Sequence, residues 1–103
     1  MAIEDGEKDW APLAVALGTR VSQERERHGL SKEALALRSG LASRYIWRVE
    51  DGRQNITLAA LAKIAGGLGI KLAELMAGVE DLVKRPVPKV DTKPRGASKK
   101  RVG

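Results

Sequence analysis

The apolar residues of this chain recur at the spacing of helices rather than of strands. Between residues 10 and 27 they stand four positions apart, at Leu13, Leu17 and Val21. Pro12 suits the first turn of such a helix, because the amide hydrogen that proline lacks has no partner there. Asp9 is placed to cap this helix and Gly29 to end it.

A second, shorter helix is predicted to begin after Ser31, which is suited to cap it, and to end at about Arg38, before a turn at Gly40. The next helix starts near residue 42 or 43 and reaches Glu50. Its two sides differ in character. The spacing buries Tyr45, Ile46 and Val49, whereas the opposite side carries Ser43, Arg44, Trp47 and Arg48.

Two further segments complete the pattern. Thr57 is suited to cap a fourth helix, whose apolar set is Leu58, Leu61, Ile64, Ala65 and Leu68. Gly66 and Gly67 in its last turn each cost ~1 kcal/mol relative to alanine, which predicts that this end frays. A last helical segment over 70–83 places on one face Leu72, Leu75, Met76, Val79, Leu82 and Val83. We therefore expect an all-α fold, a compact bundle of five short helices.

Composition limits what this bundle can be. With 103 residues the chain has room for one small core. Cysteine is absent, which excludes disulfides, thiolate catalysis and the cysteine ligands of zinc fingers. The longest apolar stretch falls short of the ~18 residues of a membrane span, and the acidic N-terminus is unlike a signal peptide. An intracellular, soluble protein is expected.

The positive charge is concentrated at the C-terminal end. The whole chain carries a formal net charge of +6, and residues 84–103 alone hold eight basic residues and one acid. This segment contains three prolines and no leucine or isoleucine, so it is expected to be a disordered basic tail that attracts DNA phosphates or has no role. Residues 1–9 are expected to form an acidic flexible arm, which leaves 10–83 as the folded domain.

Residues 31–50 have the layout of a helix-turn-helix motif, with two short helices joined through a turn that contains glycine. The second helix of such a motif is narrow enough to enter the major groove of DNA. Its outer face must then carry long polar side chains, while its inner face stays apolar. Arg44 and Arg48 supply such side chains here.

A longer set of positions extends this motif on both sides. It runs through about 60 of the 103 residues and includes Leu17-Gly18, Arg25, Gly29-Leu30-Ser31, Leu35-Ala36, Gly40-Leu41, Tyr45-Ile46, Val49-Glu50, Asn55-Ile56-Thr57-Leu58, Leu61, Ile64-Ala65 and Leu68-Gly69. In this register the sequence resembles the lambda-repressor-like family, also called the Cro or XRE type. Each piece is short, and the complete register makes the resemblance specific. It implies a five-helix DNA-binding domain.

The resemblance also implies roles for individual residues. Contacts with base edges fall to Ser43, Arg44, Trp47 and Arg48. Contacts with DNA phosphates fall to Lys32, Arg53, Gln54 and Asn55. A structural ion pair between the first helix and the recognition helix falls to Arg25 and Glu50. Some of these roles have alternatives. One of Arg44 and Arg48 is also suited to a phosphate or to solvent, Ser43 to a phosphate, and Lys32 to solvent alone. Trp47 is also suited to a sugar, a thymine methyl group or a neighbouring side chain.

Some residues depart from the family pattern. Ala42 stands where serine or threonine usually caps the recognition helix, so either Ser43 caps it one residue later or the cap is weak. Glu24 stands where many members carry leucine, which predicts a solvated edge or an ion pair with a nearby arginine. Ser39 stands where many carry alanine. The only histidine, His28, is expected at the surface near a helix end.

The stripe formed by Val79, Leu82 and Val83 extends past the point at which the family's core is complete. Apolar residues with nothing to cover usually find a partner. We therefore predict a homodimer in which the region 70–83 contributes, so that two recognition helices meet a two-fold operator. The alternative is that these residues fold back on the first helix.

Together these features predict a sequence-specific transcription regulator, bacterial or from a phage, that binds double-stranded DNA and is cytoplasmic, at the nucleoid. A controller protein of a restriction-modification system is a variant of this function. A protein-interaction module on the same fold, such as an antitoxin or an adaptor, is the alternative from another class. An enzyme has little support, since cysteine, paired acids and a phosphate loop are lacking. No catalytic residue, metal, cofactor, small-molecule substrate or membrane contact is predicted.

Overall fold

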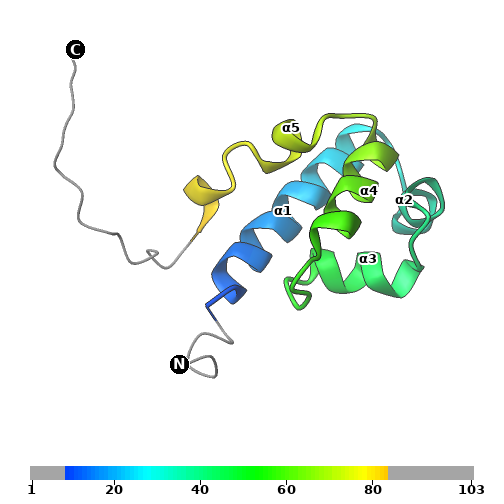
Figure 1. The fold of residues 1–103 in the computed structure, drawn as a ribbon. Helices are drawn as coiled ribbons and strands as arrows, with labels where there is room; N and C mark the ends of the chain where they lie inside the picture. The colour runs from blue at the N-terminus through cyan, green and yellow to red at the C-terminus, as the bar shows by residue number, and fades with distance from the viewer. Residues whose placement is uncertain (1–8, 84–103) are drawn as a thin grey trace, which may run out of the picture.

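The computed structural model describes residues 9–83, and helices make up all the regular structure there (Figure 1). The elements are α1 (Ala11–Arg27), α2 (Lys32–Ser39), α3 (Ser43–Glu50), α4 (Leu58–Leu68), α5 (Leu72–Met76) and the 3-10 turn η2 (Glu80–Leu82). The predicted all-helical fold is confirmed. The predicted basic tail and the predicted acidic arm, apart from Asp9, lie outside the described residues.

The core lies where these short helices meet. α2 packs against α3 and α4, α1 packs against α3, and α5 contacts both α1 and α4. The largest fully buried side chains come from all five helices and from the segment after α5; they are Val21, Leu35, Ile46, Val49, Ile64, Leu68, Leu75 and Val79. Each helix therefore buries one apolar face against its neighbours.

Two leucines that helical spacing assigns to the core are exposed instead. Leu58 begins α4 and is 71% exposed, and Leu13 lies in the first turn of α1 at the edge of an open hollow. Periodicity predicts which side of a helix is apolar, but it does not predict where the covering element ends. Both leucines stand at helix starts, past the neighbours that bury Leu17 and Leu61.

The ends of α2 and α4 are fixed by the residues expected to fix them. The Ser31 hydroxyl oxygen accepts a hydrogen bond from the Ala34 amide at 3.0 Å, and that of Thr57 accepts one from the Ala60 amide at 3.0 Å. Asp9 does not cap α1, because the residue at the cap position is Trp10 and its side chain makes no capping bond. The predicted start of α1 is therefore displaced by one residue.

α4 lies close against α2 at Gly67. A Cβ atom built there would overlap the Ser39 hydroxyl oxygen and press on the α2 backbone, whereas one built at Gly66 would meet nothing within 4 Å. α4 continues through both glycines to Leu68, and Gly69 ends it in the left-handed conformation, so the helix is regular where fraying was predicted. The close approach of the two helices, which single-chain helix propensity does not include, holds this turn in place.

We expect Gly66→Ala and Gly67→Ala to change stability in opposite directions. Alanine at position 66 should raise the free energy of unfolding by up to ~1 kcal/mol, because it restricts the unfolded backbone. Alanine at position 67 should lower it by ~1–3 kcal/mol, because the new methyl group displaces packed backbone. Urea denaturation measures both values. A Gly67→Ala variant as stable as Gly66→Ala would contradict the close packing of α2 and α4.

The segment after α4 is not the single helix expected over 70–83. α5 ends at Met76, Gly78 adopts a left-handed conformation with φ of 78°, and η2 follows. The break returns the chain to α1, so Val79 is buried in the core, and Leu82 and Val83 pack against that core with part of their surface covered. The premise that Val79 has nothing to cover is therefore wrong, and the fold-back alternative describes this segment.

Glu24 is buried at the C-terminal half of α1, so the predicted solvated edge is wrong and the predicted local ion pair is present. The Arg20 guanidinium donates a hydrogen bond to its carboxylate, while Arg27 and His28 lie 3.7 Å and 3.6 Å from the other oxygen. Arg20 also donates to the Glu74 carbonyl oxygen at 2.9 Å. The buried carboxylate thereby helps to join α1 to α5.

This arrangement makes the fold sensitive to acid. The hydrogen bond from Arg20 lowers the pKa of Glu24 below its ordinary value, and this effect exceeds the opposing effect of burial. Since the folded state holds the proton less tightly than the unfolded state, the carboxylate stabilises the fold above pH ~4.3 and this contribution is lost as the pH falls further. Thermal melts at pH 3 to 6 should show a steeper acid loss in the parent than in Glu24→Gln. Parallel curves would contradict this role of Glu24.

Candidate nucleic-acid interface

α2 and α3 form the predicted helix-turn-helix. Gly40 ends α2 in the left-handed conformation, with φ of 70°, and the Leu41 amide donates to the Ala36 carbonyl oxygen at 3.0 Å. α3 begins at Ser43 and has Ala42 at its cap position, without a side-chain cap. Of the two alternatives for this cap, the weak cap is therefore the one observed. Packing has to hold α3 in its place.

The inner face of α3 provides that packing. Ile46 and Val49 are completely buried, and the end of the helix lies directly on α1. A Cβ atom built at Gly18 of α1 would overlap the carbonyl oxygen of Val49. The two helices therefore meet backbone to backbone at this point, which fixes the height of α3 above α1.

A buried ion pair fixes the same end of α3. Arg25 Nε donates to Glu50 Oε2 at 2.7 Å and Arg25 Nη2 donates to Glu50 Oε1 at 3.0 Å, so the pair has the two-pronged geometry that the family resemblance implies. Nη1 donates to the Leu30 carbonyl oxygen at 2.8 Å. The hydrogen bonds that Arg25 donates to the Glu50 carboxylate raise the pKa of Arg25 above its ordinary value. The pair joins α1, α3 and the segment before α2.

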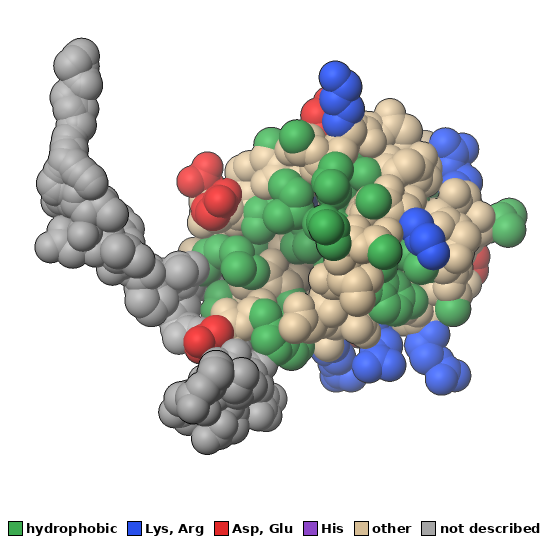
Figure 2. Space-filling model, in the orientation of Figure 1, with side chains coloured by type: hydrophobic (Ala, Val, Ile, Leu, Met, Phe, Trp, Pro, Cys, Tyr) green, Lys and Arg blue, Asp and Glu red, His purple; other side chains and the backbone are tan. Residues whose placement is uncertain are grey.

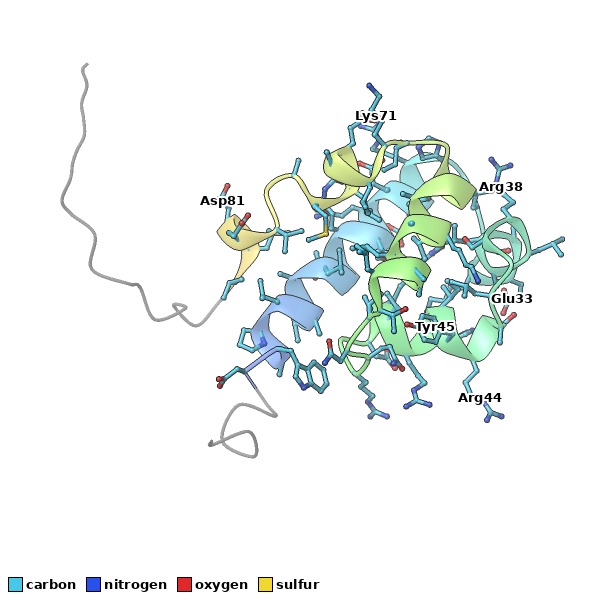
Figure 3. The ribbon with its side chains drawn as sticks, in the orientation of Figure 1. Glu33, Arg38, Arg44, Tyr45, Lys71 and Asp81 are labelled. Atoms are coloured by element: carbon cyan, nitrogen blue, oxygen red, sulfur yellow. The ribbon has the colours of Figure 1, made fainter. Side chains whose placement is uncertain are left out.

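The outer face of α3 carries the four predicted base-reading residues. Arg44, Trp47 and Arg48 are exposed and Ser43 is half-buried. Within residues 9–83, no carboxylate lies at ion-pair distance from Arg44 or Arg48. Arg44 projects away from the body of the molecule in Figure 3. The face is thus free to contact another molecule, and base reading stays a prediction.

Lys32 and Trp47 form a contact that spacing along the chain does not predict. The Lys32 ammonium lies 3.6 Å from the centroid of the Trp47 ring, although one residue begins α2 and the other lies in α3. Trp47 therefore packs against a neighbouring side chain, one of its predicted alternatives, and still keeps 47% of its surface exposed. Lys32, which is predicted to contact a phosphate, and Trp47, which is predicted to contact a base, are therefore neighbours on the surface.

The other predicted phosphate contacts lie in the loop between α3 and α4. Arg53 and Asn55 are exposed, whereas Gln54 is half-buried. Gln54 and Asn55 also line an apolar hollow beside α1. Arg53 is the only charged residue of the three, and it is exposed. The phosphate roles of this loop stay predictions.

Charge is distributed unevenly over the surface. Figure 2 shows several Lys and Arg side chains projecting from the lower edge of the molecule, where Figure 1 places α3, and others at the top and on the right, while acidic side chains are most frequent on the left, toward η2. Asp81 and Arg44 stand at opposite sides in Figure 3. The lower edge therefore presents several cations together on the side of α3.

Other kinds of site are not found in the part of the chain that the structure describes. No group of three acidic or histidine side chains there could hold a metal ion. None of the described helices has the length and the apolar character needed to cross a bilayer. His28 is exposed at the end of α1, as expected, beside Glu24.

A family model described as helix-turn-helix matches residues 13–75. Control protein C.MunI from a Mycoplasma species is 35% identical to this chain over 69 residues, which make up 66% of this chain and 93% of that protein. A protein of Neisseria meningitidis described as a hypothetical transcription factor is 31% identical over 85 residues, or 82% of this chain and 80% of that protein.

Solved structures share the fold. The restriction-modification controller protein C.AhdI from Aeromonas hydrophila matches with a TM-score of 0.59 and 40% identity, over 60% of this chain and 94% of that one. The clp gene regulator ClgR from Corynebacterium glutamicum matches with a TM-score of 0.62 and 27% identity, over 65% and 71%. These are regulators rather than enzymes. The chain thus belongs to the Cro/C1-type family of helix-turn-helix transcription regulators.

Proposed function

We propose that this protein regulates transcription by placing α3 in the major groove of a specific double-stranded DNA site. One observation carries the proposal: α3 has a fully buried, anchored inner face and an outer face on which Arg44 and Arg48 stand exposed and unpaired with any described carboxylate. A rigid helix with free guanidinium groups is suited to base readout. Its place of action is the cytoplasm, where such a regulator meets DNA.

In this proposal the two arginines read guanine. The guanidinium group donates two parallel hydrogen bonds to O6 and N7 of guanine, which discriminates against other bases by ~1–3 kcal/mol for each pair. The Ser43 hydroxyl reaches a base edge or a phosphate at the start of the helix. The protein is oriented on the duplex by phosphate contacts from Lys32, Arg53, Gln54 and Asn55.

Selection of bound sequences from a random DNA pool tests this function. The parent protein should enrich one motif, and Arg44→Ala should enrich a motif that is relaxed at one or two positions. Lys71→Ala is the matched control, because Lys71 is exposed at the edge of the molecule opposite Arg44 in Figure 3. It should enrich the parent motif. No enrichment with the parent protein would favour the alternative of a protein-interaction module.

The similarity to C.MunI and C.AhdI supports a narrower form of the same proposal, a controller of restriction-modification genes. The selected motif then has to occur in the promoter of a nearby endonuclease or methyltransferase gene. A motif found only upstream of unrelated genes would contradict the controller proposal, whereas the proposal of a general transcription regulator would stand.

We further propose that the protein binds as a homodimer. Val79 is buried in the core of its own subunit, so it cannot contribute to a dimer interface. Of the three residues predicted for that interface, only Leu82 and Val83 keep part of their surface exposed. Next to Val79 an apolar hollow of about 190 Å³ opens between α1, the loop before α4, and α5, with Leu13 and Met76 exposed at it. Figure 2 shows hydrophobic side chains gathered over this face. An apolar patch that meets its own copy suits a two-fold dimer.

We expect Met76→Glu to convert the dimer to a monomer. A carboxylate at the hollow has to be desolvated when two copies meet, which costs several kcal/mol unless it is paired. The control is Leu37→Glu, because Leu37 is 84% exposed on α2 and lies outside the hollow. Light scattering at tens of micromolar measures the mass of each form. A monomeric parent protein would refute the homodimer.

A further inference from the structure

Trp47 is the feature of the α3 surface that guanine reading leaves unexplained. A tryptophan ring with 47% of its surface exposed is costly in water, and it shares the outer face of α3 with Arg44 and Arg48. A protein partner that covered the ring would also have to desolvate these two guanidinium groups and Lys32. DNA pairs such cations with phosphates and base edges, so the surroundings of the ring favour DNA as the molecule that covers it.

The ring is oriented before any DNA arrives. The Lys32 ammonium lies 3.6 Å from its centroid and covers one face, and Lys32 itself is half-buried at the first turn of α2. A cation held over an aromatic face restrains the side chains of both residues. A restrained ring meets its ligand with less loss of conformational freedom than a mobile one.

The major groove offers one apolar group to such a ring. Each base pair presents hydrogen-bond donors and acceptors there, and thymine adds its C5-methyl group. An indole ring cannot accept the hydrogen bonds of a base edge, and it has one donor. The group that gains most from contact with it is therefore the methyl group of a pyrimidine.

From this arrangement we infer that Trp47, held by Lys32, reads the C5-methyl group of a pyrimidine at one position of the DNA site. This inference rests on the proposed function and adds a specificity to it. The protein distinguishes thymine from uracil, and 5-methylcytosine from cytosine, at that position. Lys32 is a positioning residue for the ring in addition to its proposed phosphate contact.

The test uses the full chain and the duplex selected from the random pool. Each thymine is replaced in turn by deoxyuridine, and each cytosine by 5-methylcytosine, with affinity measured by fluorescence anisotropy. Burial of one methyl group predicts that loss of the critical methyl weakens binding about fourfold. If the critical position holds a cytosine, its methylation should strengthen binding by a similar factor. The deoxyuridine series reports on the methyl group of thymine, and the 5-methylcytosine series reports on the methyl group of a methylated cytosine.

Variants at position 47 assign the effect to the ring. Trp47→Gln should bind the methylated and unmethylated duplexes equally, and Trp47→Phe should keep the difference because it retains an aromatic face. Circular dichroism melts establish that both variants are folded. A methyl effect of equal size in Trp47→Gln, or its absence at every position with the parent protein, would overturn the inference while sequence-specific binding stands. If the parent protein selects no duplex at all, the proposed function fails together with the inference.

Discussion

Arg25→Met should lower the free energy of unfolding by ~3–5 kcal/mol. The Arg25 side chain is 11% exposed and that of Glu50 is 5% exposed, so removal of the guanidinium leaves a buried carboxylate without its partner. The Leu30 carbonyl oxygen loses its donor at the same time. Urea denaturation followed by circular dichroism measures the change.

The double variant Arg25→Met/Glu50→Leu distinguishes the net contribution of the ion pair to stability from the cost of leaving one buried charge unpaired. Removing both charges relieves the unpaired carboxylate, so the double variant should recover much of the loss suffered by Arg25→Met. It should also bind DNA less specifically, because the angle between α1 and α3 is then set by apolar contacts alone. A loss below about 1 kcal/mol in Arg25→Met would mean that the pair does not hold α3.

Arg44→Ala and Arg48→Ala should each weaken binding to the selected duplex by ~1–3 kcal/mol, which is about fivefold to 150-fold. The stability of the fold should stay unchanged within ~0.5 kcal/mol, since both side chains are exposed and no described carboxylate pairs with them. Fluorescence anisotropy at fixed salt measures the affinities, with Lys71→Ala as the control.

The effect on an unrelated duplex separates base reading from phosphate binding. A base-reading arginine should lose affinity mainly for the selected duplex, and specificity should relax at the base pair that it contacts. An equal loss on both duplexes, with a reduced salt dependence, would assign that arginine to phosphate instead.

Much of the fold could be predicted because its signals are local. Ser31 and Thr57 cap the helices that they were expected to cap, and the apolar spacing of α3 places Ile46 and Val49 in the core. Such signals act within one or two turns of helix, so they can be recognised in the amino-acid sequence. The layout of α2, turn and α3 follows from them.

Features that depend on a neighbouring element could not be predicted in this way. Gly67 looks like a weak helical residue until α2 is seen against it. For Glu24 the sequence leaves a solvated edge and a local ion pair open, and only the packed structure shows that Arg20 pairs with it and also bonds to α5. The apolar stripe over 70–83 continues through Gly78, but the chain turns there, because a left-handed residue ends the segment and lets Val79 return to the core.

In the candidate site, too, some features could be predicted from the sequence and others depend on how the helices pack. The outer face of α3 follows from helical spacing and from the family register, which together bring Arg44, Trp47 and Arg48 to one surface. The contact between Lys32 and Trp47 joins two helices across a turn, and its existence depends on the angle between them. No periodicity along the chain reports that angle.

The central claim is that α3 reads a specific DNA sequence, and the ratio of two dissociation constants tests it most directly. The full chain is titrated with its selected duplex and with a duplex of the same composition in scrambled order, both at physiological salt. The claim predicts that the selected duplex binds at least about a thousandfold more tightly, as specific regulators do. Equal affinities for the two duplexes would contradict it and would reduce the protein to a binder of DNA charge.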